Sequence, residues 1–188
     1  MKYLLTLMAV LVFVGAYFYI RPRTPAPVQD ASIKDSNMKI TSSVFKEKES
    51  IPSVYTCDGR NINPPLSWEG VPPGTKSLAL IMDDPDVPKT LRPDGMFVHW
   101  VVFNIPPDLT TIEEGKEPKG TAGANGRGQG GYTGPCPPDR EHRYFFKLYA
   151  LDTLLDLPTT TNKETLLSAM NKHIISSAEL IGLYERKK

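Results

Sequence analysis

Carboxylate, imidazole and phenol side chains that could bind a small polar group occur in two proline-rich segments of the sequence. With the loop residues beside them, the candidates are Asp84, Asp86, His99, Gly134, Pro137, Pro138, His142 and Tyr144. Proline fixes the backbone φ angle and removes an N–H donor, so loops rich in proline and glycine keep one shape. The sequence therefore predicts a preformed pocket for a small polar or anionic group.

The two acids of the first segment have different expected roles. Asp84 and Asp86 flank Pro85, directly after an apolar stretch that reads as a strand. One carboxylate would face the pocket and accept a hydrogen bond from a histidine or a ligand amine. The other carboxylate would hold the loop in place by accepting hydrogen bonds from backbone N–H groups. Both could equally be turn-forming acids at the surface, a common role for Asp beside proline.

The histidines belong to apolar, alternating runs. Alternation places His99 on one face of its strand with Val101, opposite Trp100, and a lone histidine in such a run is more often a core residue than a ligand. His142 and Tyr144 are two residues apart and share one side of the next strand. Two imidazole N–H groups and a phenolic O–H together would suit phosphate or carboxylate oxygens.

Other site chemistries have weaker support in the sequence. Two histidines and an aspartate could bind zinc, but the spacing of known zinc motifs is missing, and so is the Gly-x-Ser-x-Gly turn of many hydrolases. Cys136 could act as a nucleophile near His142. Gly126 to Gly131 fits Gly-x-Gly-x-x-Gly but neither follows a strand nor opens a helix. Arg127 within it could steer an anion or be a solvated side chain. We expect no cofactor, no metal and no catalysis.

Hydrophobic alternation predicts a mainly β protein. Expected strands cover residues 38–45, 77–82, 97–105, 143–151 and 178–184. A capping-box pattern from Thr161 to Glu164, followed by apolar residues at helical spacing, predicts one late helix. These elements are typical of a two-sheet antiparallel β-sandwich with a small C-terminal helical element.

Length and charge limit the classes of protein. The chain has 188 residues, enough for one domain with a substantial core. Its 22 basic and 21 acidic residues nearly cancel, so no overall field favours nucleic acid, and we expect no nucleic-acid partner. Eighteen prolines and 14 glycines agree with a loop-rich β domain.

The amino-terminal region predicts export from the cytoplasm. Residues 1–20 read either as a cleaved signal peptide or as a transmembrane anchor, because Tyr3 to Ile20 is uncharged and about long enough to span a bilayer. Residues 21–37 read as a polar, proline-bearing linker, and residues 38–188 as the folded domain. Either interpretation makes the protein membrane-anchored, or secreted or periplasmic.

The two cysteines allow two states. Cys57 and Cys136 could form a disulfide in an oxidising compartment, or could remain as two thiols. The sequence leaves both alternatives open.

Several ordered motifs together resemble the phosphatidylethanolamine-binding protein family, especially its bacterial Raf-kinase-inhibitor-like branch. The motifs are Asp84-Pro85-Asp86-Val87-Pro88, His99-Trp100, Gly134-Pro135-Cys136-Pro137-Pro138, His142-Arg143-Tyr144, Tyr55-Thr56-Cys57-Asp58-Gly59, Asn63-Pro64-Pro65-Leu66-Ser67-Trp68 and the ending from Ala178 to Arg186. The resemblance covers about residues 38 to 186.

The resemblance implies a two-sheet sandwich whose pocket binds phosphate-like groups or phospholipid head groups without catalysis. Asp84, His99, His142 and Tyr144 match its pocket-lining residues. Asp86 matches the second acid of the loop motif, and Gly134, Pro137 and Pro138 match the wall. The sequence leaves open two other functions: an inhibitor that binds a kinase or a protease, and a hydrolase.

Overall fold

The computed structural model describes residues 37–187, and the expected signal or anchor segment at 1–20 and most of the expected linker lie outside these residues. The described part of the chain contains two sheets. The smaller has the order β1 (Lys39–Thr41), β3 (Leu66–Glu69) and β6 (Thr111–Ile112). The larger has the order β2 (Glu49–Ser50), β9 (Ile174–Tyr184), β8 (His142–Leu151), β4 (Ser77–Asp84), β5 (Phe97–Ile105) and β7 (Thr121–Ala122).

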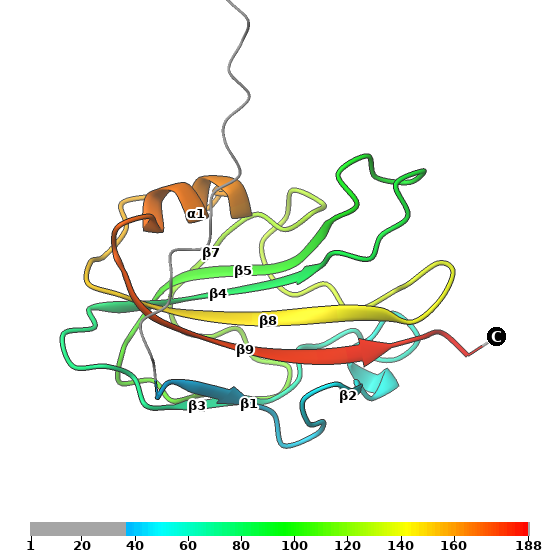
Figure 1. Cartoon of the computed structure of the whole chain (residues 1–188), viewed down its shortest axis with the longest axis horizontal. Helices are drawn as coiled ribbons and strands as arrows, with labels where there is room; N and C mark the ends of the chain where they lie inside the picture. The colour runs from blue at the N-terminus through cyan, green and yellow to red at the C-terminus, as the bar shows by residue number, and fades with distance from the viewer. Residues whose placement is uncertain (1–36, 188) are drawn as a thin grey trace, which may run out of the picture.

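The predicted two-sheet sandwich with a small helical element is confirmed. Within residues 37–187, the two sheets and one α-helix, α1 (Lys163–Met170), form three layers (Figure 1). A 3-10 turn covers Ser53–Tyr55. Neighbouring strands pair antiparallel except the short β2, which runs parallel to β9. Among residues 37–187, no helix is long and apolar enough to cross a bilayer.

Each face of the larger sheet packs against a separate hydrophobic cluster. Alternate residues of β4, such as Leu80 and Met82, are buried against Trp68 of the smaller sheet. The intervening residues, such as Ile81, are buried with Leu166 and Met170 of α1. Because β4 is apolar on both faces, it lies in the interior of the sheet, as a continuous apolar run predicts.

The last two residues of β4, Asp83 and Asp84, are polar, and their side chains point to opposite faces of the sheet. Asp83 faces the α1 side, where its carboxylate pairs with Lys147 of β8 and with Lys163 at the start of the helix. Asp84 faces the opposite side. The helix begins one residue later than the predicted capping box suggests: the Asn162 side chain, not Thr161, accepts from the backbone N–H of Thr165.

The two cysteines form a disulfide. Their Cα atoms lie 5.4 Å apart, and the bond joins the loop after the 3-10 turn to the loop before β8. The backbone N–H of Cys57 also donates to the carbonyl of Pro135 at 3.0 Å. Both connections attach the Pro-rich loop to a segment almost 80 residues earlier in the chain.

Removing the disulfide should destabilise the domain, because the bond restricts a long loop in the unfolded chain. We expect Cys57→Ser with Cys136→Ser to lower the free energy of unfolding by up to about 4 kcal/mol. Urea denaturation of the purified protein, with and without reductant, measures this. A reduced wild-type protein with the same urea midpoint as the oxidised one would contradict the expectation.

Candidate functional site

An irregularity in the pairing of β4 with β5 places His99 at the site. Met82 pairs with Trp100 and Asp83 with Val98, so His99 has no partner residue on β4. A β-bulge of this kind turns the extra residue from the alternating pattern. The His99 ring consequently lies 5.2 Å from the ring of Tyr144, centroid to centroid, although Tyr144 packs in the cluster that contains Trp100. The predicted placement of His99 opposite Trp100 is therefore wrong.

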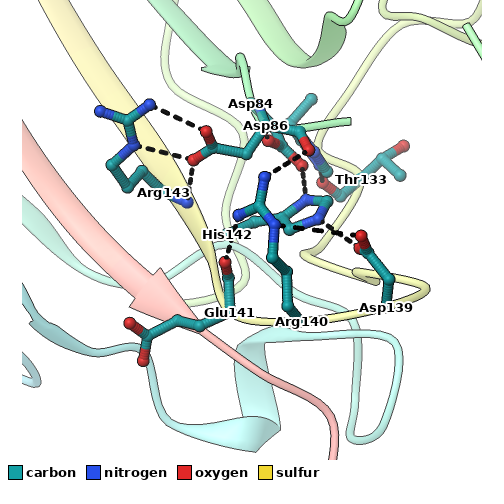
Figure 2. A network of polar contacts seen from close by, with 9 residues as sticks. Asp84, Asp86, Thr133, Asp139, Arg140, Glu141, His142 and Arg143 are labelled. Carbon is teal, nitrogen blue, oxygen red and sulfur yellow. Dashed lines mark hydrogen bonds and ion pairs between the residues drawn. The ribbon is translucent and has the colours of Figure 1, made fainter. Parts of the chain in front are cut away.

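His142 begins β8 and is fully buried between two carboxylates (Figure 2). Its Nδ1 lies 2.7 Å from Oδ2 of Asp84, and its Nε2 lies 2.8 Å from Oδ1 of Asp139. The other oxygen of Asp84 accepts from the backbone N–H of Asp86 at 2.8 Å. Burial raises the pKa of the Asp84 carboxyl, and the hydrogen bond from His142 opposes this shift. Both ring nitrogens of His142 are therefore engaged.

Asp86 holds the loop in place, which matches the role expected for the second acid. Its carboxylate accepts from the backbone N–H of Arg143 at 3.0 Å and from Nε and Nη2 of the same guanidinium at 2.8 Å each (Figure 2). These charge-assisted bonds lower the pKa of Asp86 to about 2. The loop after β4 is thereby connected to the start of β8.

The loop before β8 forms one wall of the site through backbone contacts. The backbone N–H of Thr133 donates to the carbonyl of His99 at 2.9 Å, and that of Gly134 donates to the side chain of Asn61 at 2.8 Å. A Cβ at residue 134 would lie 2.6 Å from Asn61 Oδ1 and from the carbonyl of Tyr55, so only glycine fits here.

These elements enclose a cavity of about 360 Å³. Its lining consists of Asp84, Val87, Leu91, Arg92, Phe97, His99, Arg127, Thr133, Gly134, Cys136, Pro138 and His142. Five of the eight predicted residues therefore meet at one cavity. Such a volume, mainly apolar with a few convergent polar groups, is typical of a small-molecule site.

Three of the predicted residues do not line the cavity. Asp86 acts on the loop through Arg143, and Pro137 lines a separate hollow beside the wall. Tyr144 is fully buried beneath His99, and within residues 37–187 its hydroxyl has no hydrogen-bond partner. Burial strongly raises the pKa of this phenol. Alternation predicted the side of the strand correctly for Tyr144, but its depth follows from the packing of two sheets.

Two arginines supply the positive charge of the cavity. The guanidinium of Arg92 lies 5.4 Å from the centroid of the Phe97 ring, and its Nε lies 3.6 Å from Asp94 without forming a hydrogen bond in the described part of the chain. Arg127 is exposed and belongs to the glycine-rich loop. Sequence analysis missed Arg92, since nothing in its local pattern marks it.

The glycine-rich loop is organised by the buried side chain of Asn125. Its Oδ1 accepts from the backbone N–H groups of Arg127 and Gln129, and its Nδ2 donates to Gly131 and Thr133. A Cβ on Gly126 would come within 2.9 Å of the Phe97 ring. These glycines permit a tight loop against the cavity, and the dinucleotide interpretation has no support.

His99 is an uncharged acceptor at neutral pH. Its side chain is almost completely buried, and its Nδ1 lies 2.6 Å from the carbonyl of Thr133, which can only accept, so Nδ1 carries the proton. Burial lowers the pKa of the imidazole to about 4. Nε2 is then the unprotonated nitrogen, and among the described residues it has no hydrogen-bond partner.

The arrangement offers a ligand both donors and acceptors. The arginines can donate to an anion, while His99 Nε2 and the Asp84 carboxylate accept from a ligand O–H or N–H. Cys136 lines the cavity but is bonded to Cys57, so it offers no thiol nucleophile. Residues 37–187 contain no cluster of three or more His, Cys, Asp or Glu side chains that could hold a metal ion.

Comparison with known proteins identifies the family. The family model for phosphatidylethanolamine-binding protein matches residues 41–185. The chain belongs to this family. The UPF0098 protein of Methanothermobacter thermautotrophicus is 54% identical over 155 residues, which cover 79% of this chain and 99% of the relative.

Two crystal structures of family members resemble this one throughout the domain. A phosphatidylethanolamine-binding protein homologue from Chlamydia trachomatis is 45% identical, has a TM-score of 0.79, and is matched over 82% of this chain and 100% of its own. YbcL of E. coli is 33% identical, has a TM-score of 0.73, and is matched over 81% and 100%. The family resemblance noted in the sequence is thus confirmed.

The buried, uncharged His99 predicts a pH-dependent stability. An unfolded histidine, with a pKa near 6.5, takes up a proton as the pH falls, whereas folded His99 takes it up only near pH 4. Stability is therefore lost as the pH falls from 6.5 to 4, by roughly 3 kcal/mol for this group. The raised pKa of Asp84 acts in the opposite direction.

Comparison of wild type with His99→Gln isolates the contribution of the histidine. Urea denaturation at intervals between pH 7 and pH 4 should show a steeper loss of unfolding free energy for the wild type than for the variant. Parallel curves over this range would show that His99 does not titrate as its burial requires.

Proposed function

We propose that this protein binds a small anionic, phosphate-bearing ligand in the cavity, without chemical turnover. The observation that carries the proposal is the buried Nε2 of His99, which has no hydrogen-bond partner within residues 37–187 and belongs to a cavity that Arg92 and Arg127 also line. A buried polar atom left unpaired costs free energy unless a ligand or water completes it. A phosphate group can offer an O–H donor to His99 Nε2 and oxygen acceptors to the arginines at the same time.

A phosphate monoester fits this mixture of donors and acceptors. Its second pKa lies near 6, so about a tenth of the molecules carry one O–H at pH 7, and a larger share does so at lower pH. That O–H can donate to His99 Nε2 while the remaining oxygens accept from guanidinium groups. The apolar lining from Val87, Leu91 and Phe97 suits the carbon-bearing part of an ester.

The ligand chemistry could come from a soluble phosphate ester or from a phospholipid head group. Family membership supports either source, and the neighbouring Leu91 is 64% exposed at the rim of the cavity. Titration with O-phosphoethanolamine tests the soluble source. Sedimentation with vesicles of phosphatidylcholine, with and without phosphatidylethanolamine, tests the lipid source.

Loss of Arg127 should weaken binding. We expect Arg127→Ala to raise the dissociation constant for O-phosphoethanolamine about tenfold, because a charge-assisted hydrogen bond is lost. Lys76→Ala is the matched control, since this exposed lysine precedes the far end of β4. Calorimetric titration measures both. Equal affinities for wild type and Arg127→Ala, or equal losses in the two variants, would contradict the proposed site.

Anion affinity should rise with falling pH, because a bound anion favours protonated His99. Histidines with an ordinary pKa would place this gain near pH 6, but burial of His99 moves it toward pH 4. Sulfate is the appropriate probe, since it does not titrate in this range. We expect its affinity to increase between pH 7 and pH 4.5 in the wild type and to stay nearly flat in His99→Gln. An equal increase in both proteins would exclude His99 as the titrating group.

A further inference from the structure

The two carboxylates that contact His142 are held very differently. Asp84 is 4% exposed in its side chain and is fixed by a second hydrogen bond from Asp86. Asp139 is 44% exposed in its side chain and lies on the wall loop, outside the lining of the cavity (Figure 2). The contact between Asp139 and Nε2 can therefore be broken with less disturbance than the contact between Asp84 and Nδ1.

The Asp139 carboxylate is hydrogen-bonded to the one ring nitrogen of His142, Nε2, that a ligand anion could contact. His142 lines the cavity, and its Nδ1 is already committed to Asp84. An imidazole N–H makes one strong, linear hydrogen bond, so an ionised carboxylate at 2.8 Å from Nε2 excludes a second anion from that donor. Asp139 therefore takes the hydrogen bond at Nε2 that an anion in the cavity would otherwise use.

The structure also offers a place for a displaced Asp139 carboxylate. Asp139 lines a hollow of about 420 Å³ on the other side of the wall, together with Arg140, Arg186 and Lys187. The Nε atom of Arg140 is 4.0 Å from Oδ2 of Asp139. Pro138 lines both this hollow and the cavity, so the two spaces meet at the wall. A modest rotation of the side chain would exchange the contact with His142 for one with Arg140.

We propose that Asp139 is an internal competitor for the anion site, and that ligand binding displaces its carboxylate from His142 Nε2. This inference rests on the proposed anion-binding function and adds the residue that sets its affinity. Because Asp139 must leave before any anion can bind Nε2, it reduces the affinity for every such anion by the same factor.

The test compares two variants that each neutralise one carboxylate of the same loop. Asp139→Asn removes the competitor, and Glu141→Gln is the matched control, because Glu141 is exposed and its side chain points away from His142 in Figure 2. We expect Asp139→Asn to bind inorganic phosphate and sulfate roughly tenfold more tightly than wild type, by the same factor for both anions. Glu141→Gln should stay within about twofold of wild type.

A second readout uses the wild-type protein and does not depend on a variant. The Nε2–H resonance of His142, followed by NMR, should move on addition of phosphate, together with the signals of His99. Movement of His99 signals alone, or affinity in Asp139→Asn equal to or below that of wild type, would overturn the competitor role while leaving the proposed function intact. If neither wild type nor Asp139→Asn binds either anion, the proposed function itself fails.

Discussion

The site depends on one unpaired residue in the pairing of β4 with β5. Without the bulge, alternation would place His99 on the face of the sheet that packs against α1, among Val101 and Phe103. With it, the imidazole lies above Tyr144 and joins Asp84 and His142 in the lining of one cavity. The bulge is held by the hydrogen bonds from Thr133 N–H to the His99 carbonyl and between His99 Nδ1 and the Thr133 carbonyl.

The surrounding polar groups are rigid because nearly every one has a defined partner. Asp86 binds Arg143, Asn125 organises the glycine-rich loop, and the disulfide fixes the proline-rich wall. Against this background, three buried atoms of the site have no hydrogen-bond partner within residues 37–187: Nε2 of His99, Nε of Arg92 and the hydroxyl of Tyr144. The exposed carboxylate of Asp139 is a further exception. Unsatisfied or easily displaced groups in an otherwise satisfied network are the reason why we propose that a ligand binds here.

Much of the fold follows from local patterns in the sequence, but the details of the site do not. Alternation was sufficient for β5 and β8 and for the shared side of His142 and Tyr144, because strand periodicity is local. It could not place His99, because a bulge depends on the register with another strand. Arg92 reaches the site through a loop that contacts Gly126, a residue distant in sequence, so its local pattern carried no signal. Asp139 is only three residues from His142, but an Asp at this spacing in a loop is a common turn residue. The short β2, β6 and β7 likewise depend on pairing rather than on propensity.

The central claim is that an anion binds between His99 and the arginines of the cavity. Anomalous diffraction from crystals soaked in selenate at about pH 4, where His99 takes up a proton and its Nε2 can donate to an anion, tests it directly, because selenium reports the position of the anion without reference to its hydrogen bonds. We expect a peak inside the cavity, within hydrogen-bond distance of His99 Nε2 and of a guanidinium of Arg92 or Arg127. Peaks confined to the outer surface, such as beside Arg140 and Arg186, with no peak in the cavity, would contradict it.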